Sequence, residues 1–497
     1  MHGGPIDTIL FVHGYSVTNL NSFNQLPALF AGQGFKSASL YLAGWISLDD
    51  RISCSDLAAS LEERVASLEA NVPGFDLGRT LVITHSTGAI ITRRWILDRY
   101  NRRKVDSRVK TLSHFVSCAG ANHGSTMAQL GTSELAYIYR NLTEGQAVGK
   151  RVLQDLDYGS AFLRALNREW MTAWNDMNDP LYADTFCFSM GGTDHSFWQN
   201  QLTWQSREFG SDGTVRISGA NLNYTWITVG PPTYGTLQHE VLAQSAPHLV
   251  IESAGKRYSH TSQNTPDNDN LVFDATGAVA TIMHLGQSTP VSVSKETYGI
   301  VEGIASPAER PFTALGEAIG VQDVASYKAL SNSWAAETNT WSSHNTAEVN
   351  STAVVAVLDE SRSPIDDSLV VIKDSNGIGA VTDSLLGNQP IPNAANPSIK
   401  SFYINTAKFE QVHGHQIHVA ALADTPYVTY GKTIDGPLSN VDPTDNRHVI
   451  QGNEFTYVDV FVARDPAAAF AIYGLDNPNL PTFVGTNFPP FDPRGRM

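Results

Sequence analysis

The sequence predicts an α/β protein in which a parallel sheet is covered by helices on both faces and is followed by a second, β-rich domain. Residues 1–290 alternate short apolar runs with segments of helical periodicity, which is the pattern of a parallel sheet. From residue 291 onward helical periodicity mostly stops. β-like runs then alternate with clusters of Pro, Asn, Asp and Gly, as in sandwich-like sheet domains. With 497 residues the chain is long enough for about two or three domains, and we divide it into 1–290 and 291–497.

Six short apolar runs are the expected strands of the parallel sheet. They are bounded by turn-forming residues and are short enough for strands. In chain order they are residues 8–12, 36–42, 80–84, 111–118, 184–189 and 248–252. The β-like runs of the second domain are residues 352–358, 368–373, 401–406, 416–422, 427–433 and 456–463.

Helices are expected between these strands. Leu57 and Leu61 belong to an apolar series at helical spacing, and Ser53 with Asp56 forms the capping box that would start this helix. Residues 89–100 predict a second helix directly after the third strand.

A long, mostly helical insertion separates the fourth and fifth strands. Residues 125–180 carry no strand signal, which predicts a helical cap over a site at the carboxyl ends of the strands. The alternative is a solvent-facing helical excursion without a gating role.

The composition bears on the classes of partner and on the cellular location of the protein. Lys plus Arg number 33 against 49 for Asp plus Glu, so the net charge is −16, which argues against nucleic-acid binding. It also argues against docking to an anionic membrane by charge, so any lipid contact should be apolar. The longest apolar run is residues 467–473, far below the roughly 20 residues of a spanning helix, and no Sec-type export signal is evident. We expect a protein of the cytoplasm or of a membrane surface, or one exported by a non-Sec route.

The strongest local motif is Thr84-His85-Ser86-Thr87-Gly88, which follows a strand and opens a helix. This context predicts the nucleophile elbow of α/β-hydrolases, in which a serine sits on a tight strand-to-helix turn. The turn needs small residues two positions before and after the serine. Gly88 meets that need, whereas Thr84 replaces the usual first glycine. The alternative is a serine at an ordinary helix N-terminus.

A nucleophilic serine needs a histidine base and a carboxylate that orients the base. In this fold the acid follows the serine in the chain and the histidine comes last. Asp212 lies between two glycines after the fifth strand, which lets its carboxylate project into a site. We predict Asp212 as the acid, with Asp194 as the runner-up. The alternative for Asp212 is a turn aspartate that bonds its own backbone.

The base is predicted to be His260. It follows the last strand and precedes a segment near residues 272–283 that we interpret as the last helix. His284 falls late in that predicted helix, and His239 and His248 precede the loop, so these three are weaker candidates.

The oxyanion of the reaction needs preorganised N–H donors. We predict the N–H of Thr87, directly after the nucleophile, and the N–H of Tyr15, in the loop after the first strand. His13 should have a packing or hydrogen-bonding part. Asn122 and His123 resemble loops that shape the acyl-pocket rim of lipases and are candidates for that rim, with a structural part favoured for His123.

No cofactor or metal is expected. His413, His415 and His418 suggest a metal site, but only the first two would share a face of a strand, and no third ligand is evident. The three cysteines are far apart and predict no disulfide framework.

These blocks resemble those of the PlaB-type bacterial phospholipases A/lysophospholipases A. The resemblance is carried by the elbow around Ser86, the Gly-Ser-Asp-Gly loop around Asp212 and the Ser-His pair ending at His260. The separations of 126 and 48 residues and the two-part layout also suit that family. The resemblance implies cleavage of acyl esters in glycerophospholipids and lysophospholipids, assembly into homo-oligomers, and peripheral membrane association without a Sec signal.

The predicted oxyanion loop already follows the first strand. The two antiparallel strands that usually precede it are therefore missing, and we expect a reduced α/β-hydrolase sheet of about six parallel strands. The predicted function is a serine hydrolase acting on phospholipids and lysophospholipids. The alternatives are a general carboxylesterase or acyltransferase on the same triad, or a lipid-binding scaffold protein with a vestigial hydrolase domain.

Overall fold

The protein's structure is a computed structural model. The residues it describes are 4–15, 23–40, 49–125, 128, 149–194, 210–229, 239–243, 245–253, 256–259, 269–273, 279–284, 298–359, 362–365, 368–373, 391–393, 395–406, 416–421, 429–430, 434–437, 450–462 and 464–465.

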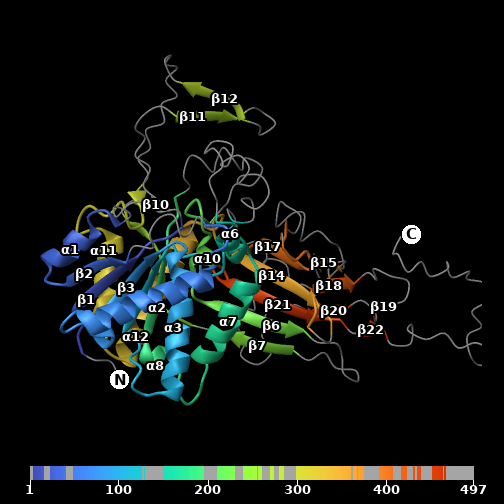
Figure 1. The fold of residues 1–497 in the computed structure, drawn as a ribbon. Coiled ribbons are helices and arrows are strands. Elements are labelled where there is room, and N and C mark those ends of the chain that lie inside the picture. Colours follow the sequence, from blue (N-terminus) through green and yellow to red (C-terminus); the bar gives the residue numbers. More distant parts are fainter. Residues whose placement is uncertain are drawn as a thin grey trace, which may run out of the picture.

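A six-stranded parallel sheet forms the first part of the fold and confirms the predicted class (Figure 1). Its strand order is β2-β1-β3-β4-β5-β8, and every neighbouring pair is parallel. The strands are β1 (Thr8–Val12), β2 (Lys36–Leu40), β3 (Thr80–His85), β4 (His114–Cys118), β5 (Phe186–Gly191) and β8 (His248–Val250). The chain runs from β1 outward to β2 and then returns to the other side of β1. The carboxyl ends of β1 and β3 therefore flank the point where the strand order reverses, which is where open α/β sheets bind their ligands.

Helices cover both faces of this sheet. They are α1 (Leu26–Gly32), α2 (Cys54–Asn71), α3 (Gly88–Val105), α11 (Arg310–Ile319) and α12 (Val324–His344). In Figure 1, α2 and α3 lie in front of the sheet and α11 and α12 lie behind it. The rings of Phe30 on α1 and Phe312 on α11 stack at 4.8 Å, so these two helices share a face. The capping box of Ser53 and Asp56 at the start of α2 is confirmed.

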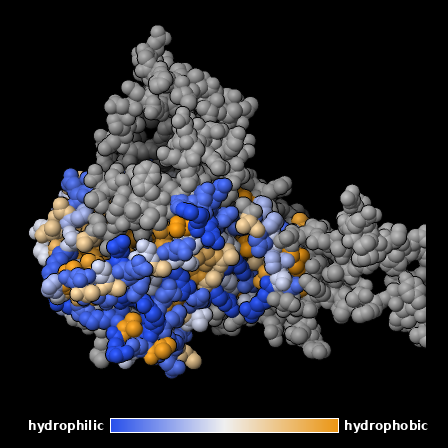
Figure 2. All heavy atoms as spheres, in the orientation of Figure 1, coloured by the Kyte–Doolittle hydropathy of each residue, from blue (hydrophilic) through white to orange (hydrophobic). Residues whose placement is uncertain are grey.

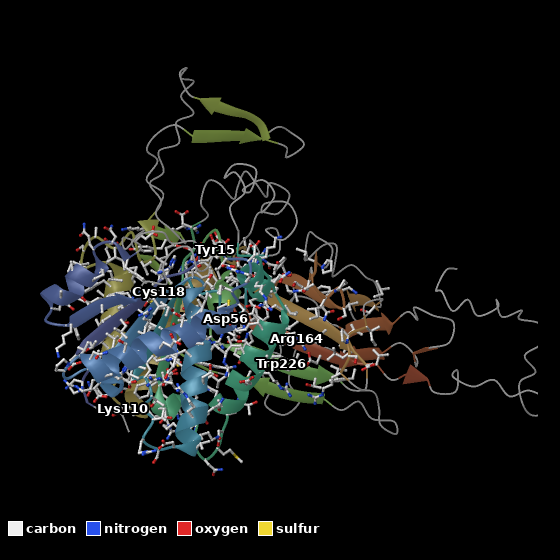
Figure 3. All side chains as sticks on the ribbon, in the orientation of Figure 1. Tyr15, Asp56, Lys110, Cys118, Arg164 and Trp226 are labelled. Atoms are coloured by element: carbon white, nitrogen blue, oxygen red, sulfur yellow. The ribbon has the colours of Figure 1, made fainter. Side chains whose placement is uncertain are left out.

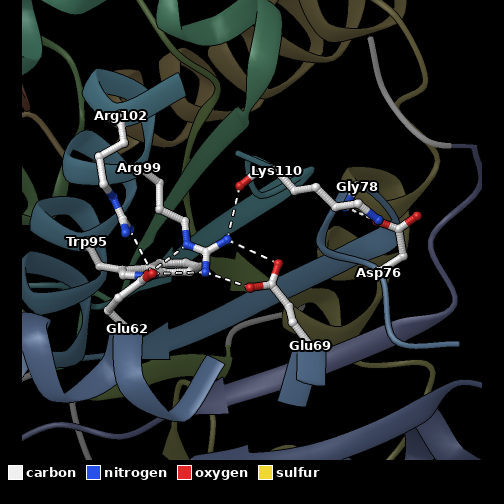
Figure 4. A network of polar contacts seen from close by, with 8 residues as sticks. All are labelled: Glu62, Glu69, Asp76, Gly78, Trp95, Arg99, Arg102 and Lys110. Atoms are coloured by element: carbon white, nitrogen blue, oxygen red, sulfur yellow. Dashed lines mark hydrogen bonds and ion pairs between the residues drawn. The ribbon is translucent and has the colours of Figure 1, made fainter. Parts of the chain in front are cut away.

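A buried arginine joins α2 to α3 (Figure 4). The guanidinium of Arg99 forms ion pairs with Glu62 at 2.7 Å and with Glu69 at 2.8 Å. The indole N–H of Trp95 also donates to Glu62, at 2.6 Å. Because α3 begins directly after the elbow, this network holds the helix that carries the predicted nucleophile.

The second part of the fold is a mixed sheet with the order β16-β17-β14-β21-β6-β7. Its strands are β16 (Ile391–Pro392), β17 (Ile399–Asn405), β14 (Asn350–Leu358), β21 (Phe455–Phe461), β6 (Tyr224–Val229) and β7 (His239–Ala243). A three-stranded sheet of β15 (Ser368–Lys373), β18 (Gln416–Ala421) and β20 (Ile434–Pro437) lies next to it. Val370 of β15 shares an apolar core with Val355 and Val458 of the mixed sheet, which gives this region a layered form.

Elements from each side of the division predicted at residue 290 pack with elements from the other side. β6 and β7 precede that position and belong to the mixed sheet. Conversely, α11 and α12 follow it, yet Leu315 and Trp334 are fully buried in the core of the parallel sheet.

The described helices of the 125–180 insertion lie at the junction of the two sheets. They are α6 (Lys150–Leu156) and α7 (Ala161–Trp174), and the short α8 (Leu181–Asp184) follows. α7 packs against α3, and its Met171 shares a core with Trp226 and Tyr457 of the mixed sheet. Figure 3 labels Arg164 of α7 beside Trp226, and the Arg164 guanidinium lies 5.3 Å from the Trp226 ring. Residues 126–127 and 129–148 lie outside the described residues, so the cap over the site stays a prediction.

The helix predicted near residues 272–283 is wrong. The structure has an antiparallel hairpin there, made of β11 (Asp269–Phe273) and β12 (Val279–His284). Between the two strands the sequence carries Asp274 and Gly277, which are turn formers, and the apolar runs on each side are only strand-length. His284 is the last residue of β12 and not part of a helix.

Among the residues coloured in Figure 2, the surface in view is mainly hydrophilic, with small separate apolar groups. Within the described residues, no helix combines the length and the apolarity that crossing a membrane requires.

Candidate active site

Ser86 occupies a strained turn between β3 and α3. Its φ is 56°, in the left-handed region that a residue with a side chain rarely adopts. The carbonyl of Ser86 accepts hydrogen bonds from the N–H groups of Ala89 (3.1 Å) and Ala121 (3.2 Å). The loop after β4 therefore holds the turn in place. This geometry is that of a nucleophile elbow.

Glycines allow the elbow to touch the loop after β1. A Cβ added at Gly14 would lie 2.6 Å from the Ser86 Cβ and 3.1 Å from its Oγ. A Cβ added at Gly88 would lie 2.6 Å from the carbonyl oxygens of Val12 and His13. A side chain at either position would clash, so the absence of a Cβ lets the Gly14 backbone approach the Ser86 side chain and lets Gly88 approach the backbone of Val12 and His13. Thr84 is accommodated because its hydroxyl turns away and donates to the Val116 carbonyl across to β4.

His13 fixes the peptide plane that carries the predicted oxyanion donor. Its Nδ1 lies 2.8 Å from the Gly14 carbonyl oxygen, so Nδ1 carries the proton and donates. Burial lowers the pKa of His13, and the bond to Gly14 raises it by less, so the ring is neutral at pH 7. In a trans peptide the C=O and N–H point in opposite directions. Holding the Gly14 carbonyl therefore also orients the Tyr15 N–H. Figure 3 shows Tyr15 and Cys118 toward the same edge of the parallel sheet, where the strands end.

Thr87 lies between Ser86 and the first residue of α3. Its side chain is buried, and its carbonyl accepts from the Ile91 N–H at 3.3 Å. Its own N–H belongs to the first turn of the helix, where backbone donors have no partner within the helix.

Asp212 is buried in a loop that both neighbouring glycines help to form. Gly210 and Gly213 have φ values of 68° and 99°, which glycine adopts without strain. Asp212 is 1% exposed, and its Oδ1 accepts from the N–H groups of Thr214 (3.0 Å) and Val215 (2.8 Å). These bonds hold the carboxylate in one orientation.

The structure brings Asp212 to the strand that precedes the predicted base. A Cβ added at Gly192 would lie 3.2 Å from the Asp212 Cβ and would clash with the Tyr258 carbonyl. Tyr258 belongs to β10 (Lys256–Ser259), which ends directly before His260. His260 itself lies outside the described residues.

The runner-up acid, Asp194, is also next to this strand. Its N–H and that of Thr193 donate to the Tyr258 carbonyl at 3.0 and 2.9 Å. Both candidate acids are therefore near the end of β10. The Oδ1 bonds of Asp212 to its own loop are those of the turn aspartate named above as the alternative.

Asn122 and His123 are fully buried between the two sheets and do not lie on an open surface. The Asn122 amide donates to Ser117 Oγ at 2.9 Å and to the Ala220 carbonyl at 2.7 Å. Nε2 of His123 donates to the Asn221 carbonyl at 3.0 Å. Burial lowers the pKa of His123 well below its usual value, so the ring stays neutral.

The other histidines considered as bases or metal ligands lie in strands or outside the described residues. His248 of β8 bonds Ser189 Oγ at 2.9 Å, and burial lowers its pKa to about 3, so it is a core residue. His239 is the first residue of β7, and His418 lies on β18. His413 and His415 lie outside the described residues. Among the residues that the structure describes, no group of His, Cys, Asp and Glu could hold a metal ion.

The sequence did not reveal Arg93, two turns along α3 from the elbow. It is fully buried and donates to the Asn122 carbonyl and to Asn167 Oδ1, both at 2.9 Å. Its guanidinium lies 4.6 Å from the centre of the Trp170 ring. An arginine in a helix gives no sequence signal of burial, because such residues usually face solvent.

Comparison with known proteins places this geometry in context. Residues 7–193 match the family of class 2 lipases. The solved structure of phospholipase PlaB from Legionella pneumophila in complex with thio-NAD is 19% identical, with a TM-score of 0.72 over 95% of this chain and 97% of that one. A second structure of phospholipase PlaB from Legionella pneumophila is 20% identical, with a TM-score of 0.73 over 96% and 97% of the two chains. None of the curated proteins compared with this chain matches it.

The family match and the shared fold support a lipolytic ester hydrolase. The resemblance to the PlaB-type phospholipases is confirmed at the level of the fold: this chain has the fold of the Legionella phospholipase over nearly its whole length, and its first 193 residues contain a segment of class 2 lipase type.

Proposed function

We propose that this protein is a serine hydrolase that cleaves acyl esters of glycerophospholipids and lysophospholipids with Ser86, His260 and Asp212 as its triad. The observation that carries the proposal is the strained Ser86, with φ 56°, in contact with the Gly14 loop. Strain of this kind persists only where surrounding structure enforces it, and it is found mainly at functional sites.

In the proposed reaction Ser86 Oγ attacks the acyl carbonyl carbon while His260 takes the serine proton. His260 then gives that proton to the departing alcohol oxygen, which leaves an acyl-serine ester. Water attacks this ester by the same route and releases the fatty acid and the free serine. Asp212 accepts the other ring N–H of His260 and stabilises the imidazolium form.

The negative charge on the carbonyl oxygen requires donors that are already in place. The N–H groups of Thr87 and Tyr15 are the proposed pair. The support is the contact between the two loops at Gly14 and Ser86, together with the bond from His13 that orients the Tyr15 peptide.

A phospholipid substrate is proposed because the fold spans the full length of a protein described as a phospholipase. The homo-oligomer and the peripheral membrane contact belong to the same proposal. With a net charge of −16, contact with an anionic lipid surface would depend on apolar side chains.

The test is a lipid panel assayed with the wild type and with Ser86→Ala. The panel contains diacyl and lysophospholipids, triacylglycerol and a soluble short-chain ester, each with and without a long-chain alcohol acceptor. We expect fatty acid release from the phospholipids, lost in Ser86→Ala. Release from the short-chain ester alone would favour a general carboxylesterase, and new esters with the alcohol would favour an acyltransferase. A folded wild type that is silent on the whole panel would contradict an enzymatic role and favour a lipid-binding scaffold.

A further inference from the structure

The segments that carry the proposed acid and base are held by residues of the chain after position 290. β10 is a short strand, and it shares only two residue pairs with β9 (Glu252–Ser253) and two with β13 (Tyr298–Gly299). Backbone pairing of this extent fixes a strand weakly. Its side chains supply further anchors.

One side of β10 is tied to Glu309, at the start of α11. Glu309 Oε2 accepts from Lys256 Nζ at 2.6 Å and from the Tyr258 hydroxyl at 3.2 Å. Alternate residues of a strand point to opposite faces, so Arg257 faces the other way.

Arg257 is bound by the link between α12 and β14. Its Nη1 lies 3.0 Å from Glu348 Oε1, and its Nη2 donates to Asn345 Oδ1 at 3.2 Å. Glu252 lies 3.4 Å from its Nε. The Glu348 side chain is only 15% exposed, so its ion pair with Arg257 is better shielded from solvent than a surface pair.

The same link supports the loop of the proposed acid. Gly210, which opens the Asp212 loop, packs so closely on the Glu348 carbonyl that a Cβ there would clash with it. Further along, the Arg216 guanidinium lies 3.6 Å from the centre of the Tyr403 ring of β17. Ser218 Oγ lies 2.7 Å from Thr352 Oγ1 of β14.

From this arrangement we infer that Glu348 is a positioning residue for the triad. Its backbone carbonyl packs against Gly210 at the start of the Asp212 loop, and its carboxylate pairs with Arg257 on the strand that ends directly before His260. This inference rests on the proposed function. Acid and base are 48 residues apart in the chain, and Glu348 contacts the segment of each. In the proposed triad its role is to hold the Asp212 loop and the strand that ends directly before the base.

The test compares Glu348→Gln with the matched control Glu337→Gln. Glu337 of α12 also pairs with an arginine, Arg310, at 2.8 Å, but the contacts of that pair run between α11 and α12. Full-length proteins are assayed on a soluble short-chain ester, and the pH profile of kcat/KM is recorded. A displacement of about 1 Å in a catalytic group costs on the order of 100-fold in rate, so we expect Glu348→Gln to lose about 10- to 100-fold in kcat with KM within about twofold.

The pH profile separates positioning from simple loss of fold. A base whose acid is displaced loses stabilisation of its charged form, so its pKa falls and the acidic limb of the profile moves to lower pH. Glu337→Gln should have the kcat of the wild type, and the acidic limb of its pH profile should lie at the same pH as in the wild type. If Glu348→Gln does not fold, Arg257→Gln carries the same expectation. Arg257→Gln combined with Glu348→Gln should cost no more than the larger single change, because both remove one interaction.

The inference is overturned if Glu348→Gln keeps kcat within about twofold and the acidic limb unmoved, since positioning predicts a larger loss. It is also overturned if Glu337→Gln produces the same loss. Failure of the proposed function looks different, because the wild type would then release no fatty acid and Ser86→Ala would change nothing.

Discussion

His13 is expected to act on catalysis without touching substrate. Its ring holds the Gly14 carbonyl, and the Tyr15 N–H belongs to the same peptide plane. We predict that His13→Phe fills the same space but lowers kcat on a short-chain ester by about 10- to 100-fold, somewhat less than removal of an oxyanion donor itself. KM should change little.

A matched control for this prediction is His114→Phe. His114 of β4 is also a buried histidine whose ring nitrogen lies 2.8 Å from a carbonyl oxygen. That carbonyl belongs to Val321, in the link between α11 and α12. The folded fraction of His114→Phe should keep the wild-type kcat. Equal losses in the two variants would mean that the His13 bond matters only for stability.

The residues of the elbow could be predicted from the sequence because the signal is local. A strand, a serine between small residues and a helix follow one another directly around Ser86. The parts played by Glu348 and Arg257 could not be predicted, since each depends on a partner about 90 positions away in the chain. Neither residue stands in a motif.

At the scale of elements, α2 and α3 are joined by a buried charge. The Arg99 side chain is 4% exposed and forms ion pairs with both Glu62 and Glu69. We predict that Arg99→Met lowers the free energy of unfolding by about 3 kcal/mol, because it removes a buried cation from two partly buried carboxylates, of which Glu62 keeps its pair with Arg102. Urea unfolding followed by circular dichroism measures this change.

The control is Arg108→Met. Arg108 pairs with Asp106 at 2.8 Å, but its side chain is 88% exposed, and exposed pairs contribute about 0–1 kcal/mol. If Arg99→Met and Arg108→Met lower the free energy of unfolding by the same amount, burial is not the source of the Arg99 effect.

The strand and helix assignments show where periodicity alone succeeds and where it fails. All six strands of the parallel sheet were predicted. Five of them are short runs that the structure buries completely, whereas β2 was predicted from the alternation of residues 36–42 and has exposed residues. The helix expected over residues 272–283 is wrong, because short apolar runs fit a helix and a hairpin equally well and only the turn formers between them favour the hairpin.

For the whole molecule, the core of the parallel sheet includes residues from both sides of position 290. Phe312, Leu315 and Trp334 complete the core of the parallel sheet from beyond position 290. We predict that a protein ending at residue 290 does not fold cooperatively, since it loses this apolar cover. Thermal unfolding and hydrolysis of a short-chain ester check this. A truncated protein with a sharp transition and wild-type activity would contradict the prediction.

The buried neutral histidines also set how the whole protein responds to acid. The pKa of His248 is lowered by burial to about 3, and those of His123 and His13 are also lowered by burial. In the unfolded chain these groups take up protons below about pH 6.5, whereas in the fold they resist protonation. Stability is therefore present above pH 6.5 and is lost as pH falls from there toward about 3 for His248.

The measurement is the free energy of unfolding at pH 7 and at pH 5. His248, whose pKa in the fold is about 3, contributes a loss of about 1.4 kcal/mol per pH unit below pH 6.5, so His248→Gln should show a shallower slope than the wild type. His344 is exposed, and His344→Gln should keep the wild-type slope. A wild type whose stability is flat across this range would contradict the account.

The most direct test of the central claim, that Ser86 is a nucleophile activated by His260 and Asp212, is covalent labelling with a fluorophosphonate followed by peptide mass spectrometry. We predict one adduct, on Ser86, in the wild type and none in Ser86→Ala. The labelling rate should fall by several orders of magnitude in His260→Asn and by less in Asp212→Asn, because the base cannot be replaced and its orienting acid matters less. An adduct on another serine, or labelling of His260→Asn at the wild-type rate, would contradict the account.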